Sequence, residues 1–165
     1  YGGTKYGGID EINGNILYVN GEGDFYSLDL NENNYLFKAV STEPLNINKD
    51  KFIQENKDEI GNRGMYNFGV KDILIEEFNN FNNKVLLLSS LNYLEKKNCY
   101  TLSIFLSEIL NEINLKISGW KNVFSTKDCL TINLSPKYKF AAAGAGGRLF
   151  KFDDNNILLS VGEFW

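Results

Sequence analysis

Residues 7–40, GGIDEINGNILYVNGEGDFYSLDLNENNYLFKAV, decide the fold. Asn13-Gly14 within this stretch is the strongest short signal for a β-hairpin turn, because both residue types tolerate positive φ. Short apolar runs bounded by turns rich in Asn, Gly and Asp predict four strands joined by hairpins. Four consecutive antiparallel strands form a meander, which is the size of one β-propeller blade.

The same organisation returns twice further along the chain. Residues 69–124 predict a second meander, with the apolar run Val85–Leu88 as an inner strand and a fourth strand at residues 120–124. A third unit covers residues 146–165 and repeats the Gly-Gly start and the apolar second strand of the first unit. Internal repetition of this kind is typical of propellers and other repeat architectures.

We therefore predict an all-β fold, a partial propeller with two blades and the start of a third. Ile16–Val19, Val85–Leu88 and Ile157–Val161 should be equivalent, buried strands. Residues 42–67 lack a strong apolar face and are predicted to be a connector, whereas the composition of residues 106–113 is compatible with a helix.

Both ends of the sequence are expected to be cuts in a longer protein. The chain begins with Tyr1 instead of Met, and it stops at Trp165 directly after an apolar strand pattern. On this interpretation the remaining propeller blades are an expected partner, and the sequence carries no usable targeting signal.

The composition argues against several classes of partner and mechanism. The net charge is −4 and the basic residues are scattered, which argues against nucleic acid and against a polybasic membrane patch. No apolar run approaches the roughly 20 residues needed to cross a bilayer. The absence of histidine excludes serine–histidine and cysteine–histidine nucleophile pairs within these residues. Cys99 and Cys129 leave two alternatives open, a pair of free thiols or a disulfide formed in an oxidising compartment.

Residues 140–165, FAAAGAGGRLFKFDDNNILLSVGEFW, contain the most informative motif. They resemble the motif region of the soluble PQQ-dependent glucose/sorbosone dehydrogenases, a family of quinoprotein β-propellers. Gly147-Arg148-Leu149 matches the family's Gly-Arg-Leu, Asp153–Asn155 matches the turn that follows, and residues 158–162 match the next apolar strand and its glycine.

The resemblance implies an oxidoreductase that transfers a hydride from a sugar or polyol to PQQ, with calcium as a second cofactor. It also implies a periplasmic or extracellular location. The residues placed to contact the cofactor are Gly146, Gly147 and Arg148, because a fixed guanidinium can pair with the carboxylates of the quinone. A structural role for Arg148, hydrogen-bonded to carbonyls of a neighbouring blade, is the alternative.

The sequence departs from the family at the catalytic base. The position of the family's histidine falls on Gly144, or on Ala143 if the extra glycine is an insertion, and neither residue can accept a proton. The chain is therefore expected to be inactive by itself. The alternatives are a non-catalytic binding or scaffold propeller of the same lineage, and an unrelated adhesion or lectin-like β domain.

Three acidic groups are weaker candidates for a functional site. The pairs Glu76-Glu77 and Asp153-Asp154 are adjacent in sequence, and neighbouring residues on a strand point to opposite faces. Asp153–Asn155 is therefore expected to form a hairpin turn. Asn20, Glu22 and Asp24 could chelate calcium from a turn, but their spacing lacks a full calcium-loop signature.

Overall fold

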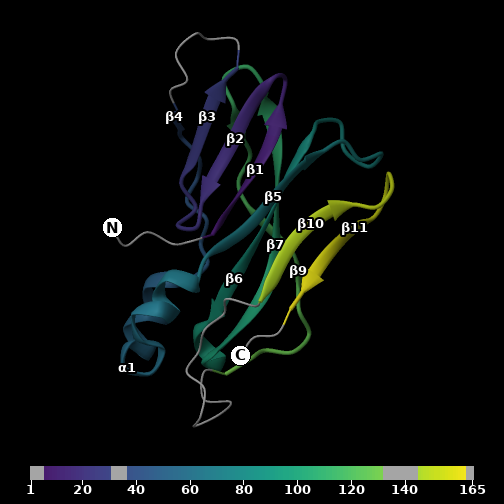
Figure 1. The fold of residues 1–165 in the computed structure, drawn as a ribbon. Helices are drawn as coiled ribbons and strands as arrows, with labels where there is room; N and C mark the ends of the chain where they lie inside the picture. Colours follow the sequence, from purple (N-terminus) through teal and green to yellow (C-terminus); the bar gives the residue numbers. More distant parts are fainter. Residues whose placement is uncertain (1–5, 31–36, 132–144, 163–165) are drawn as a thin grey trace.

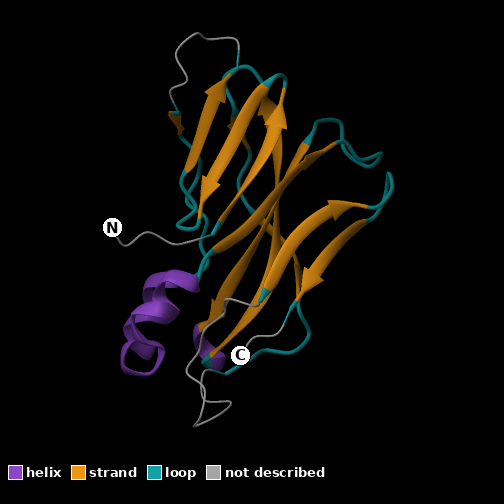
Figure 2. Ribbon diagram, viewed as in Figure 1, coloured by secondary structure: helices purple, strands orange, loops and turns teal. Residues whose placement is uncertain are grey.

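The protein folds into three antiparallel β-sheets and one helix, as a computed structural model shows for residues 6–30, 37–131 and 145–162 (Figures 1 and 2). Strands account for 53% of the chain and helix for 10%, which confirms the prediction of a mostly β, antiparallel fold. No helix in the described part is long and apolar enough to cross a membrane.

The first sheet is the predicted four-stranded meander, and its strands pair in chain order. Asn13 and Gly14 join its first two strands with φ of 51° and 74°, so the predicted hairpin turn is confirmed. The strands are β1 (Gly7–Ile12), β2 (Asn15–Asn20), β3 (Phe25–Asp29) and β4 (Lys38–Val40).

The central sheet is the second predicted meander, with two short strands at its far side. Both of these short strands pair with the long strand β7. The strand predicted at residues 120–124 is present as β9, but the helix considered for residues 106–113 is wrong, because β7 continues to Asn111. The strands are β5 (Val70–Glu76), β6 (Val85–Leu94), β7 (Cys99–Asn111), β8 (Lys116–Ile117) and β9 (Lys121–Ser125).

The third unit is a two-stranded hairpin, β10 (Gly146–Lys151) and β11 (Ile157–Val161). Its turn contains Asp153–Asn156, as predicted for the acidic pair. The prediction that Ile157–Val161 is as buried as its counterparts is wrong. The strand is half-buried to exposed, because β11 has one partner strand and only one face of the hairpin rests on the central sheet.

Residues 49–67 form helix α1 (Lys49–Asn67), where the sequence predicted an irregular connector. Phe52 is fully buried, and its ring stacks on Phe68 at 4.1 Å and meets Tyr93 edge-on at 5.5 Å. Asn48 begins the helix at φ 55°, and its side-chain amide donates to the Tyr93 carbonyl at 2.9 Å. The helix is thus held by tertiary contacts at its start, which a search for an amphipathic face does not detect.

Two apolar clusters join the three sheets. The larger cluster includes Leu17 and Val19 of the first sheet with Leu86 and Leu88 of the central sheet, all fully buried. The smaller cluster places Leu149 of the β10–β11 hairpin against the other side of the central sheet. The first strands of all three units lie side by side as a result, with β1 and β10 both beside β5 (Figure 1).

A disulfide joins Cys99 and Cys129, with the two Cα atoms 5.6 Å apart. Of the two alternatives left open by the sequence, the structure therefore has the bridge. Tyr100 and Leu130 exchange two backbone hydrogen bonds of 2.9 Å directly beside it. The bridge thus pins the segment that follows β9 to the start of β7.

Candidate functional site

The predicted cofactor residues Gly146 and Gly147 begin β10, where the backbone comes very close to β5. Both have positive φ, 76° and 105°. A Cβ on Gly147 would lie 2.4 Å from the Lys71 Cβ, which no side chain could tolerate. A similar approach exists on the other side of β5, where a Cβ on Gly8 would lie 2.4 Å from the Ile73 nitrogen. These glycines therefore serve close packing of the first strands.

Arg148, the third predicted residue, pairs with Asp72 of β5. Its Nη1 donates to Asp72 Oδ1 at 3.1 Å, and the next backbone amide, Leu149 N–H, donates to Asp72 Oδ2 at 2.9 Å. The Asp72 side chain is 6% exposed, whereas the Arg148 side chain is 76% exposed. Asp72 therefore fastens the β10–β11 hairpin to the central sheet, and the arginine still presents much of its guanidinium to solvent.

An analogous carboxylate links the first sheet to the central sheet. Asp10 Oδ2 of β1 accepts a hydrogen bond of 2.6 Å from the Ile75 backbone amide of β5. Burial raises the pKa of Asp10, and the hydrogen bonds from the Ile75 and Glu11 amides oppose that rise. Both junctions between sheets thus use a carboxylate from the first strand of one unit and a backbone amide from the first strand of the next.

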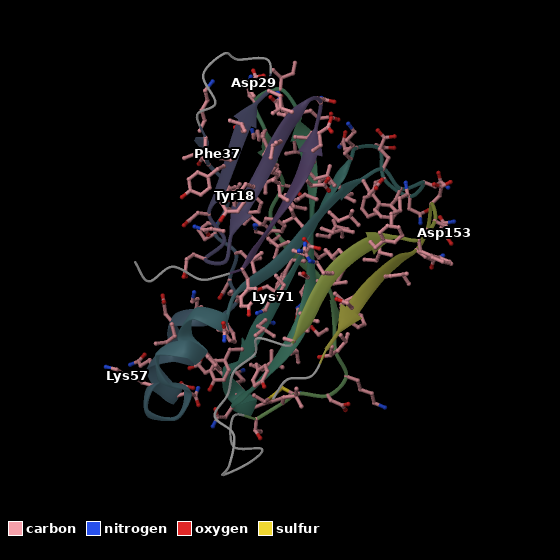
Figure 3. The ribbon with its side chains drawn as sticks, viewed as in Figure 1. Tyr18, Asp29, Phe37, Lys57, Lys71 and Asp153 are labelled. Carbon is pink, nitrogen blue, oxygen red and sulfur yellow. A yellow bond between two sulfur atoms is a disulfide. The ribbon has the colours of Figure 1, made fainter. Side chains whose placement is uncertain are left out.

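Lys71 is a buried lysine that sequence reasoning missed. The β5–β6 register shifts between Val70 and Asp72, so Lys71 is the extra residue of a β-bulge. Its Nζ donates to the Asn67 carbonyl at 2.6 Å and lies 4.1 Å from the centre of the Tyr6 ring. Burial, with a smaller contribution from Lys49, lowers the pKa of Lys71 to about 8 (Figure 3).

The backbone at the start of β10 also forms hydrogen bonds with two serine hydroxyls. Ser89 Oγ of β6 donates to the Gly147 carbonyl, and the Arg148 amide donates to Ser160 Oγ at 2.9 Å. The polar groups gathered around Gly147 are therefore satisfied mainly by one another. Among these groups the Arg148 side chain is the one that remains mostly exposed.

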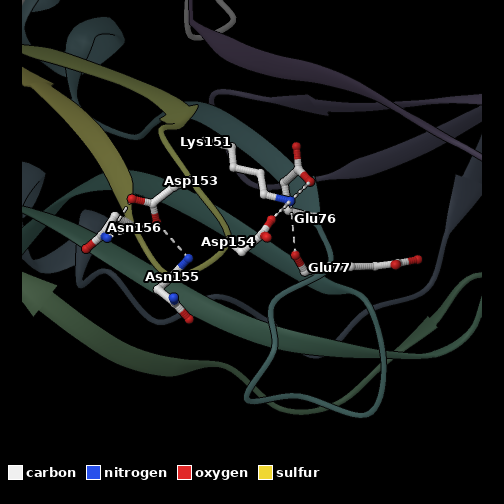
Figure 4. Close-up of polar contacts among 7 residues, drawn as sticks. All are labelled: Glu76, Glu77, Lys151, Asp153, Asp154, Asn155 and Asn156. Atoms are coloured by element: carbon white, nitrogen blue, oxygen red, sulfur yellow. Dashed lines mark hydrogen bonds and ion pairs between the residues drawn. The ribbon is translucent and has the colours of Figure 1, made fainter.

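The structure brings together one member of each acidic pair, Glu76 and Asp154, on either side of Lys151. The sequence prediction concerned only the two members of a single pair. Lys151 Nζ lies 3.1 Å from Glu76 Oε2 and 3.6 Å from Asp154 Oδ1, and it also donates to the Glu77 carbonyl (Figure 4). The Glu76 hydrogen bond is the main reason that the pKa of Lys151 is raised. These groups form an ion-pair cluster that ties the hairpin to the end of β5.

Asp153 has a different role from Asp154. Its Oδ1 accepts hydrogen bonds of 2.8 Å from the Asn155 amide and from the Asn156 side chain, and these bonds lower its pKa (Figure 4). An aspartate that bonds the backbone two residues further on is a common turn element. The turn predicted at this position is thus confirmed at the level of side chains.

The turn at Asn20 is also held by hydrogen bonds from one of its own side chains. Asn20 Oδ1 accepts from the amides of Glu22 and Asp24 at 2.9 Å, and its Nδ2 donates to Asp24 Oδ2 at 2.9 Å. The residues considered as calcium ligands therefore hold the turn together. No cluster of three or more His, Cys, Asp or Glu side chains suited to a metal exists among the side chains that the structure describes, those of residues 6–30, 37–57, 67–131 and 145–162.

The described residues do not form a complete site for PQQ and calcium. Gly144 and Ala143, on which the family's base position falls, lie outside the described residues. Arg148 offers an exposed cation, but Asp72 already accepts from its Nη1, and Lys71 is directed at Asn67. Searches of protein-family models, curated proteins and solved structures found no match to this chain.

Sequence reasoning missed Asp72, Lys71 and Ser89 as parts of this region. Asp72 is 76 residues from Arg148, and nothing in the local sequence indicates that the two side chains meet. The sequence did contain one signal for these carboxylates. Gly7 and Gly69 each stand three residues before an aspartate that links two sheets, Asp10 and Asp72 respectively. That Gly-x-x-Asp pattern at the start of both units could have identified the carboxylates as linkers.

Proposed function

We propose that the chain is a section of a β-propeller wall that acts as a binding or scaffold module and does not itself catalyse a reaction. The observation that supports it best is the repeated junction between units. Asp10 and Asp72, each from the first strand of a unit, accept from a backbone amide of the next unit's first strand. Propellers are built by radial repetition of such meanders, with the first strands nearest the axis.

Two apolar outer faces are consistent with further blades on either side. On the first sheet, Ile9, Tyr18 and Tyr26 are direct cross-strand neighbours on the face turned away from the core, and Ile9 is 59% exposed. On the hairpin, Phe150 and Leu158 are paired residues that are 66% and 52% exposed. Apolar surface of this kind usually marks a contact with another partner.

The propeller proposal predicts that the isolated chain self-associates through these outer faces. Replacing both Phe150 and Leu158 with lysine should reduce the associated fraction, because it places charge on the face that a further blade would cover. Size-exclusion chromatography with light scattering measures the fraction as a function of concentration.

Val123→Lys with Phe124→Lys is the matched control, since these residues are also about half exposed but lie on β9, away from both outer faces. The control should associate like the unmodified chain. A strictly monomeric unmodified chain, or equal effects of the two double variants, would contradict the proposal.

A second candidate is a quinoprotein dehydrogenase as the parent protein, acting on a sugar or polyol with PQQ and calcium. The exposed guanidinium of Arg148 favours it, because the quinone's carboxylates are suitable partners for arginine. The missing histidine argues against turnover by this chain, since general-base assistance contributes about 10²–10⁴-fold.

We therefore predict no dye-linked oxidation of glucose or sorbosone above the free-cofactor background when PQQ and calcium are added. Histidine at Gly144 or Ala143 should not create activity by itself, because Arg148 is already bonded to Asp72 and would hold the quinone weakly. Turnover above background that disappears in Arg148→Ala would show that the second candidate is correct for this chain.

A further inference from the structure

The first sheet and the β10–β11 hairpin lie on opposite sides of the central sheet, and each turns an apolar outer face away from it (Figure 1). The outer face of the first sheet includes Ile9 and the rings of Tyr18 and Phe37, whose centres are 6.0 Å apart. The outer face of the hairpin includes Phe150 and its cross-strand partner Leu158. The stack of three units therefore ends in an apolar surface on both sides.

A charged side chain stands beside the apolar residues on each outer face, and the two charges are opposite. Glu11 follows Ile9 by two residues on β1, so the two share a face. Glu11 is exposed, and its carboxylate forms no hydrogen bond or ion pair with the residues that the structure describes. Arg148 precedes Phe150 by two residues on β10, and its side chain is 76% exposed. Its bond to Asp72 uses Nη1 and leaves most N–H groups of the guanidinium available.

Opposite charges favour contact between the two unlike faces. Two hairpins packed on each other would place Arg148 of both copies in one interface, and two first sheets would place both copies of Glu11 in one interface. Like charges across an interface oppose association, whereas a hairpin packed on a first sheet brings arginine toward glutamate. Such a contact between unlike faces is heterologous, so it can repeat from one copy to the next.

The same order of packing already exists within the chain. The first sheet packs on one face of the central sheet, and the hairpin packs on the other face, with β1 and β10 both beside β5. Each unit therefore meets the next through unlike faces. A second copy whose first sheet covers the hairpin continues this order by one step, whereas contact between two hairpins reverses it.

We propose that a second copy of this chain covers the outer faces, docked head to tail, with the first sheet of one copy on the β10–β11 hairpin of the other. Phe150 and Leu158 pack against the ring of Tyr18. Arg148 of one copy faces Glu11 of the other. The inference rests on the proposed function, and it names the source of the further blades. Because every copy carries both faces, successive contacts form a closed ring where the rotation between copies permits it.

Two double variants, each blocking one face, test this arrangement on the full 165-residue chain. Ile9→Lys with Glu11→Lys blocks the first sheet, and Phe150→Lys with Leu158→Lys blocks the hairpin. All four side chains are exposed, so both variants should fold. Each variant alone should associate at least about tenfold more weakly than the unmodified chain. An equimolar mixture should form a species of two chains and stop there, because one interface is intact and both remaining faces carry lysine. Size-exclusion chromatography with light scattering measures the mass.

Backbone amide NMR shifts locate the contact in the mixture. When only the hairpin variant is isotope-labelled, adding the unlabelled first-sheet variant should shift amides of β1 and β2 and leave those of β10 and β11 unchanged. Labelling the first-sheet variant should reverse the pattern. The β9 control, Val123→Lys with Phe124→Lys, should associate alone as the unmodified chain does.

Glu11→Lys and Glu11→Gln provide a second measure that leaves the apolar residues in place. The lysine variant should associate more weakly than the glutamine variant, because only lysine repels Arg148 across the interface. Equal association of the two variants would overturn the head-to-tail contact.

The outcomes separate this inference from the proposed function. If the unmodified chain associates but either blocked variant associates equally well alone, or the mixture stays monomeric, the head-to-tail contact is wrong and the propeller proposal stands. A strictly monomeric unmodified chain would contradict the propeller proposal itself, and the inference with it.

Discussion

Replacing Cys99 and Cys129 together with serine should lower the free energy of unfolding by about 3.5 kcal/mol. The bridge spans 30 residues, and closing a loop of that length removes conformational entropy from the unfolded chain of about this size. The enclosed segment contains most of β7 and all of β9, so the loss should appear as weaker protection of β9 amides as well as a lower denaturant midpoint.

Reduction of the unmodified protein provides the matched comparison. Dithiothreitol should shift the unmodified chain to the stability of the double-serine variant and should leave that variant unchanged. Equal denaturant midpoints with and without the reductant would contradict the prediction. Disulfides form and persist in oxidising environments, and the periplasmic or extracellular location implied by the sequence resemblance stays a prediction.

The meander could be predicted from sequence because local signals there agree with one another. Asn13 and Gly14 have the positive φ values that their turn requires, and Leu17 and Val19 of β2 are fully buried. The prediction that Ile16–Val19 is buried on both faces is wrong for the other face, where Ile16 and Tyr18 are only half-buried. In β6 the run Val85–Leu88 is buried on both faces, because the first sheet covers one side and the hairpin the other. Local hydrophobic patterning is sufficient to predict the burial of a strand where another sheet packs on each side of it.

Burial of β11 and the helix α1 could not be predicted in the same way, because each depends on what packs against it. Leu158 carries the same apolar pattern as Leu17, yet Leu158 is 52% exposed and Leu17 is fully buried. In α1 the ring of Phe52 reaches the core and forms an aromatic cluster with Phe68 and Tyr93. Tertiary packing of this kind stabilises a helix whose local sequence has only a weak preference for helical structure.

The prediction that Gly146, Gly147 and Arg148 contact a cofactor stays a prediction, and the contacts that the structure does show at Gly147 and Arg148 are contacts between sheets. The structural alternative expected Arg148 to hydrogen-bond to carbonyls of a neighbouring blade. Arg148 does contact the neighbouring sheet, but its partner there is the carboxylate of Asp72. Gly147 allows β10 to approach β5 closely enough for that contact. The partner is remote in sequence, so only the three-dimensional register could reveal it.

Replacing Asp72 with alanine should cost about 2–4 kcal/mol of unfolding free energy and should loosen the β10–β11 hairpin first. The change leaves the buried Leu149 amide without an acceptor and removes a charge-assisted bond to Arg148. Hydrogen exchange should therefore show faster exchange of hairpin amides, while the amides of the first sheet keep their protection, because Asp10 holds the other junction.

Asp154→Ala is the matched control on the same hairpin. Its carboxylate is 74% exposed and lies 3.6 Å from Lys151, so its loss should cost less than about 1 kcal/mol. Asp72→Asn should fall between the two, since an amide oxygen can still accept from Leu149 while the ionic contact with Arg148 is lost. If Asp72→Ala leaves hairpin exchange unchanged, the carboxylate is not what fastens the third unit. The two junctions, at Asp10 and at Asp72, would then have to be explained by apolar packing alone, and the main support for a repeated propeller junction would be lost.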